Sequence, residues 1–78
     1  MAVYRAGEMY GANPIRNRDA FTLIAGDRVR LHARALSAPR LGAGRVFVVR
    51  TVDGPRYSPW IETACGERVA PWEVERAS

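Results

Sequence analysis

The fold class of this chain is decided by residues 26–34, which read Gly-Asp-Arg-Val-Arg-Leu-His-Ala-Arg. Apolar and polar side chains alternate along this stretch, with the apolar ones at positions 29, 31 and 33. A period of two is typical of a strand that buries one face. The Gly-Asp pair before it is typical of a turn. The stretch therefore predicts a half-buried strand over residues 27–34, whose exposed face is basic.

Four more short strands are predicted downstream, over residues 45–52, 58–64, 67–70 and 73–76, with almost no α-helix. A long loop over residues 35–44 is indicated by Pro39, Gly42 and Gly44. Pro59 cannot donate to a strand ladder, so the third strand should start late, bulge or lie at an edge. Pro71-Trp72-Glu73 predicts a single helical turn before the last strand.

The strand over residues 45–52 is apolar on both faces, with Val46, Val48 and Val52 on one and Phe47 and Val49 on the other. We expect the first face to point inward. The predicted core comprises Val29, Leu31, Val46, Val48, Ile61 and Val69. Phe47 and Val49 would then form an outer apolar patch, which monomeric proteins usually avoid.

The first 24 residues differ from the rest, because they show neither helical nor alternating periodicity. We divide the single domain into an N-terminal arm, residues 1–24, and a strand-rich barrel, residues 25–78. The arm carries apolar side chains without a periodic element to bury them: Tyr4, Met9, Tyr10, Ile15 and Phe21. We expect these, with Phe47 and Val49, to form the interface of a homo-oligomer. The alternative is an arm that lies over its own barrel.

Three local motifs resemble those of SH3-like barrels. They are the Gly-Asp-x-Val opening at residues 26–29, the Gly-x-Val piece at residues 44–46, and the closing turn and strand over residues 70–75. The resemblance implies an all-β, five-stranded SH3-like barrel. Similar motifs occur in RNA-binding domains of the KOW type, in the β-subunit tail of nitrile hydratases, which packs on a partner subunit, and in type II dihydrofolate reductases, which form tetramers around a pore.

The active-site segment of those reductases, Val-Gln-Ile-Tyr, is not matched here. The nearest segment is Glu67-Arg68-Val69-Ala70, which lacks both the Gln and the Tyr. Reductase activity is therefore not implied. Small integron-cassette and phage proteins also use barrels of this kind.

The numbers of cysteine and histidine residues limit which disulfides, metal sites and cofactors we expect. The 78 residues contain one cysteine, Cys65, and one histidine, His32, so we expect no internal disulfide, no metal site and no cofactor. The start has no signal-peptide pattern and no apolar run is long enough to span a membrane. A lone thiol suits a reducing compartment, so we expect a cytoplasmic protein.

The net charge is +4, and all twelve basic residues are arginine. The absence of lysine can reflect the coding bias of a GC-rich genome. The distribution is more informative, because residues 1–50 carry a balance of +6 and residues 51–78 one of −2. A nucleic-acid or anion site is predicted along the basic face of the first strand and the loop after it: Arg28, Arg30, His32, Arg34, Arg40 and Arg45.

No catalytic residue is predicted. His32 and Cys65 have no partner at a spacing that indicates nucleophilic catalysis, and the glutamates fall on exposed strand faces. Three functions remain open. The first is a non-enzymatic module that binds a protein or another copy of itself, the second is single-stranded nucleic-acid binding, and the third is a ligand or enzyme site formed at an oligomer axis.

Overall fold

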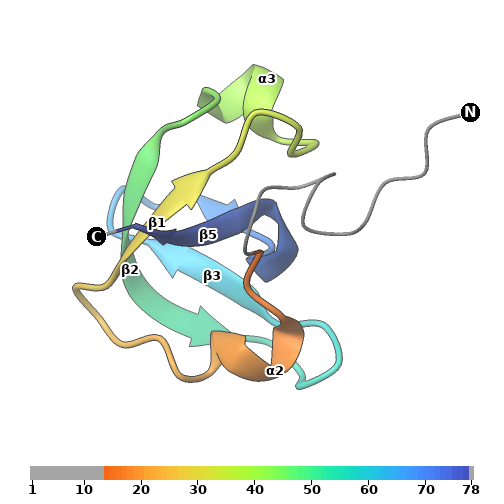
Figure 1. Ribbon diagram of the computed structural model, residues 1–78. Coiled ribbons are helices and arrows are strands. Elements are labelled where there is room, and N and C mark those ends of the chain that lie inside the picture. The colour runs from red at the N-terminus through yellow and green to blue at the C-terminus, as the bar shows by residue number, and fades with distance from the viewer. Residues whose placement is uncertain (1–13, 78) are drawn as a thin grey trace, which may run out of the picture.

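Five antiparallel strands form a single curved sheet in the computed structural model, which describes residues 14–77 (Figure 1). The strand order is β4-β3-β2-β1-β5. The strands are β1 (Arg28–Leu31), β2 (Val46–Asp53), β3 (Trp60–Thr63), β4 (Arg68–Val69) and β5 (Val74–Ala77). The all-β class is confirmed, and each strand begins and ends within three residues of its predicted place, with the end of β1 the farthest from it.

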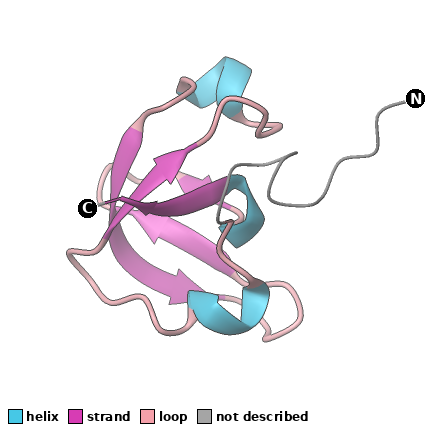
Figure 2. Cartoon of the chain, in the orientation of Figure 1, coloured by secondary structure: helices cyan, strands magenta, loops and turns pink. Residues whose placement is uncertain are grey.

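The helices in the described residues are short (Figure 2). They are α2 (Asn17–Ala20), α3 (Ala38–Leu41) and the 3₁₀ turn η1 (Pro71–Glu73). The helical turn predicted before the last strand is therefore confirmed. The sequence did not indicate α2 or α3, because four residues are too few to show a helical period. None of the helices in residues 14–77 is long and apolar enough to cross a membrane.

The described part of the arm lies over the sheet of its own chain. Pro14 forms an isolated bridge with Glu75, and the backbone amide of Ile15 donates to the Val74 carbonyl at 3.0 Å. The arm therefore pairs with β5 at the edge of the sheet, a common way to protect an exposed edge strand. Ile15, Ala20 and Leu23 are buried in the main core.

The first strand has the predicted register. Val29 and Leu31 are buried, and Arg28 and Arg30 are exposed. The strand ends at Leu31, however, three residues before its predicted end. The chain turns there, as the amide of Ala35 donates to the His32 carbonyl at 3.1 Å. His32 is therefore 8% exposed, and its expected place on the basic exposed face is wrong.

The second strand has the opposite face inward from the one predicted. Phe47 and Val49 are 2% and 1% exposed, whereas Val46 and Val48 are 39% and 43% exposed. Pairing with β1 explains this, because residues opposite each other in an antiparallel pair share a face. Phe47 lies opposite Val29, so both point into the core. Val48 lies opposite Arg28, so both are on the outer face of the sheet.

This inversion removes the part of the expected oligomer surface that lies on β2, and Ile15 is buried as well. Phe47, Val49 and Ile15 are core residues of their own chain, so they are not available at the surface. Phe21 is 44% exposed. The other predicted interface residues, Tyr4, Met9 and Tyr10, lie outside the described residues.

Candidate nucleic-acid interface

The outer face of β1 carries two arginines one step of the strand alternation apart, which is about 7 Å. Arg28 lies between Ala77 of β5 and Val48 of β2, and Arg30 lies between Glu75 and Val46. Arg28 thus has an uncharged residue on either side, and Arg30 has a carboxylate on one side. The exposed valines form an apolar strip beside the two guanidinium groups.

Several arginines elsewhere are already matched by carboxylates. The ion pairs are Arg40–Glu67 at 3.0 Å, Arg50–Glu62 at 3.4 Å and Arg76–Asp27 at 3.6 Å. Arg45 and Arg68 instead lie over the rings of Phe47 and Trp60. Five further arginines of the described chain form no carboxylate ion pair: Arg16, Arg18, Arg28, Arg30 and Arg56. These five are exposed and remain available to an external anion.

The structure does not bring the six residues of the predicted site together. Arg34 is exposed, but it lies in the turn after β1 rather than on the strand. Arg40 is paired with Glu67. Arg45 lies over the Phe47 ring, 4.7 Å from its centroid, and Nη1 donates to the Leu41 carbonyl at 3.4 Å. With His32 buried, only Arg28 and Arg30 form the basic stripe.

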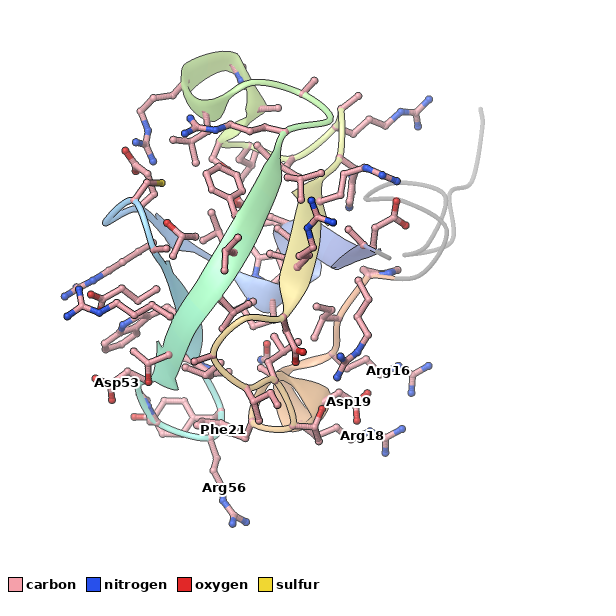
Figure 3. All side chains as sticks on the ribbon, turned by 90° about the vertical axis from the view of Figure 1, so that its left-hand side faces the viewer. Arg16, Arg18, Asp19, Phe21, Asp53 and Arg56 are labelled. Atoms are coloured by element: carbon pink, nitrogen blue, oxygen red, sulfur yellow. The ribbon has the colours of Figure 1, made fainter. Side chains whose placement is uncertain are left out.

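A second group of arginines, called here the second basic surface, lies at the end of the molecule that carries α2, where Asp19 and Asp53 are also found (Figure 3). Arg18 and Phe21, from α2 and its C-terminus, and Arg56, from the loop between β2 and β3, line a cavity of about 370 Å³. Next to Arg56, Tyr57 is 84% exposed. Two cations and one exposed aromatic ring therefore line this surface, and the loop from Thr22 to Asp27 connects it to β1.

Sequence reasoning did not predict this second surface. Phe21 was assigned to an oligomer interface, and Arg18 and Arg56 were assigned no role. Arg18 and Arg56 are far apart in the sequence, and only the packing of α2 against the β2–β3 loop brings them together. The one local signal was the combination of arginine and aromatic residues in two non-periodic segments, 16–21 and 56–57.

The buried polar groups form a separate cluster behind β1. The Ser37 hydroxyl donates to Glu73 Oε2 at 2.6 Å, and the His32 amide donates to the Glu73 carbonyl at 3.3 Å. Burial lowers the pKa of His32, against the opposing influence of the Glu75 and Glu73 carboxylates. The cluster links η1 to the turn after β1, which is a structural role.

The thiol of Cys65 lies in the exposed turn between β3 and β4. Its Sγ is 3.2 Å from Thr63 Oγ1 and 3.8 Å from Arg45 Nη2. Hydrogen bonding, chiefly with Thr63, lowers the pKa of this thiol. In residues 14–77, no group of three or more His, Cys, Asp or Glu side chains is placed to hold a metal ion.

Comparisons of the chain with family models, with curated proteins and with solved structures found no match. The functional inference therefore depends on the residues themselves. Their arrangement suits the binding of a polyanion, because the unpaired guanidinium groups lie on two exposed surfaces beside apolar and aromatic side chains.

Proposed function

We propose that the protein binds single-stranded nucleic acid, with Arg28 and Arg30 holding phosphates on the outer face of β1. The observation that carries this proposal is the pair of exposed guanidinium groups on one strand face, neither matched by a carboxylate ion pair within residues 14–77. The two residues are about 7 Å apart along the strand, close to the spacing of successive phosphates along an extended single strand.

A single strand is favoured over a duplex by the exposed aromatic residues. Proteins that bind single strands combine a positive surface that follows the backbone with aromatic rings on which unpaired bases stack. Phe21 is exposed on the second basic surface, and Tyr57, next to Arg56 in the sequence, is exposed as well. In a duplex the bases are already stacked on each other, so these rings would contribute little.

The same face is a poor surface for self-association. The exposed strip of Val46 and Val48 is bordered by Arg28 and Arg30, so a second copy docked by a two-fold axis would bring arginines from both chains together. Like charges in contact across an interface disfavour it. A polyanion matches the charge and covers the valines. Three residues of the expected oligomer interface are also buried in the core of their own chain, where they cannot contact a second copy: Ile15, Phe47 and Val49.

The test is the affinity of the full chain for fluorescent single-stranded RNA and DNA oligonucleotides. Replacement of both Arg28 and Arg30 by Ala should weaken binding by at least about tenfold, since each lost charged hydrogen bond to a phosphate is costly. The matched control is the Arg40→Ala variant, which removes one exposed arginine that is already paired with Glu67. It should leave the affinity nearly unchanged. Equal loss in the two variants would contradict a site on β1.

Glu75 provides a variant with the opposite expected effect. Its carboxylate lies opposite Arg30, where it repels an approaching phosphate. The Glu75→Gln variant should therefore bind the oligonucleotide about two- to threefold more tightly, in line with the size of exposed charge interactions. Unchanged or weaker binding would show that phosphates do not pass this part of β1.

A further inference from the structure

The cavity between α2 and the β2–β3 loop is the second feature that suits an anion. Its lining in the described residues consists of Arg18, Phe21 and Arg56, and it encloses about 370 Å³. That volume lies within the range of about 300–1,000 Å³ typical of small-ligand sites. Two arginines from different elements and one aromatic ring thus line a space that a small molecule can enter, with the two guanidinium groups directed away from each other (Figure 3).

The two sides of this cavity are held together by the fold. Asn17 Nδ2, on α2, donates to the Tyr57 carbonyl of the opposite loop at 3.1 Å. The α2 segment is anchored on either side of Phe21, because Ala20 and Leu23 are both buried in the core. The arrangement of the lining residues is therefore set before any ligand arrives, which lowers the ordering cost of binding.

The ring of Phe21 is not needed by the core of its own chain. It is 44% exposed, although the neighbouring apolar residues Ala20 and Leu23 are fully packed. No carboxylate in residues 14–77 forms an ion pair with Arg18 or Arg56. An exposed aromatic face beside two unmatched cations is complementary to a ligand that has both a flat ring and a negative charge.

A larger cavity of about 550 Å³, lined in part by Asp19 of α2, offers a contrast. Its lining includes the carboxylates of Asp19 and Glu75, and its one arginine, Arg76, is already paired with Asp27. This cavity has no unmatched cation among its described residues, so it does not suit a phosphate. The smaller cavity is the one whose chemistry selects an anion.

We infer that the Arg18–Phe21–Arg56 cavity binds one nucleotide of the strand, with the base stacked on Phe21 and its phosphate bound by one of the two flanking arginines, Arg18 or Arg56, an inference that rests on the proposed function. A nucleotide combines a flat ring with a phosphate, as the lining requires. The strand would then run from β1 along the Thr22–Asp27 loop to the cavity. Arg28 and Arg30 hold its backbone, and Phe21 fixes one base.

Titration of the full chain with adenosine 5′-monophosphate, followed by amide NMR shifts, tests this inference. The shifts should concentrate in α2 and residues 54–58, and adenosine or inorganic phosphate alone should bind more weakly than the nucleotide. The Phe21→Leu variant keeps an apolar side chain without a ring face, and it should weaken nucleotide binding at least about fivefold. The Arg18→Gln/Arg56→Gln variant should abolish it. The control Arg40→Gln should change nothing.

Two results would overturn the inference. One is oligonucleotide binding that depends on Arg28 and Arg30 while the nucleotide causes no shifts around Phe21. The other is phosphate binding as tight as that of the nucleotide and unaffected by Phe21→Leu. The reverse pattern, nucleotide binding at the cavity without oligonucleotide binding on β1, would support the cavity site and contradict the proposed function. Variant spectra that match the wild-type spectrum away from the substitution exclude misfolding as the cause.

Discussion

At the scale of single residues, Gly54 shows how a turn and a side chain depend on each other. It follows β2 with a φ of 90°, in the left-handed region that favours glycine. A Cβ at this position would lie 2.6 Å from Cε3 and Cζ3 of Trp60. The ring can pack here only because residue 54 lacks a side chain, and Arg68 covers it at 5.3 Å from the ring centroid.

Gly54→Ala should therefore be more destabilising than an alanine at another glycine of the same backbone conformation. The matched control is Gly26→Ala, because Gly26 has a φ of 97° and nothing within 4 Å of the added Cβ. Backbone strain alone should cost the control about 1–2 kcal/mol, and the clash with Trp60 should add about 1–3 kcal/mol for Gly54. Urea unfolding measures both. Equal losses of stability would contradict the close packing of Trp60 on the turn.

Cys65 gives a second prediction at this scale. The lowered thiol pKa means that more thiolate is present at neutral pH than for an ordinary cysteine, so iodoacetamide should react faster at pH 7. The hydrogen bond with Thr63 is the largest cause, so Thr63→Val should shift the rate profile to higher pH, and Arg45→Gln should shift it less. A larger shift for Arg45→Gln would reverse the assigned order of causes.

At the scale of the elements, the sequence predicted a strand face correctly wherever the two faces differ in polarity. In β1, arginine alternates with Val29 and Leu31, so only one face of the strand is apolar. That face is the buried one in the structure. In β2 both faces are apolar, so alternation could not decide, and the register with β1 placed Phe47 inward and Val46 outward. A shift of one residue in the register moves every side chain of a strand to the opposite face of the sheet. The apolar patch expected from Phe47 and Val49 is therefore buried.

The candidate site was predictable in part for the same reason. Arg28 and Arg30 lie on the polar face of a clear alternating pattern, so their exposure could be predicted. The Arg18–Phe21–Arg56 cavity could not, because α2 is a single turn in a segment without periodicity and its partner loop lies far along the chain. Likewise, the burial of His32 depends on the turn that ends β1, and the alternation gave no sign of that turn.

His32 yields a prediction on the pH dependence of stability. Because burial lowers its pKa in the folded chain below the ordinary value of 6.5, the unfolded chain takes up the proton first as the pH falls. The contribution of His32 to stability is therefore present above about pH 6.5 and decreases below it. His32→Gln should show a shallower fall in the free energy of unfolding between pH 7 and 5 than the wild-type chain.

Chemical denaturation at several pH values measures this difference. The carboxylates of Glu73 and Glu75 oppose the effect of burial on His32, so Glu75→Gln should make the pH dependence steeper. An identical pH dependence for wild-type and His32→Gln would show that the imidazole does not differ between the folded and unfolded chains.

At the scale of the whole molecule, two groups of arginines differ in whether a carboxylate lies beside them. One group of arginines forms ion pairs across the fold, such as Arg40–Glu67 and Arg50–Glu62. The other group has no carboxylate partner in the described part of the chain and is exposed on the outer face of β1 and around the α2 cavity. Exposed ion pairs add little stability, so the unmatched arginines are the ones available for binding.

The salt dependence of oligonucleotide binding tests the proposed function most directly. For single strands, the logarithm of the binding constant falls with the logarithm of the salt concentration by about 0.7 per neutralised phosphate. We expect measurable binding of a single-stranded oligonucleotide at about 50 mM salt, with a steep negative slope. The Arg28→Ala/Arg30→Ala variant should lower this slope by about 1.4. No binding at that salt concentration, or the same slope in both proteins, would contradict phosphate recognition by β1.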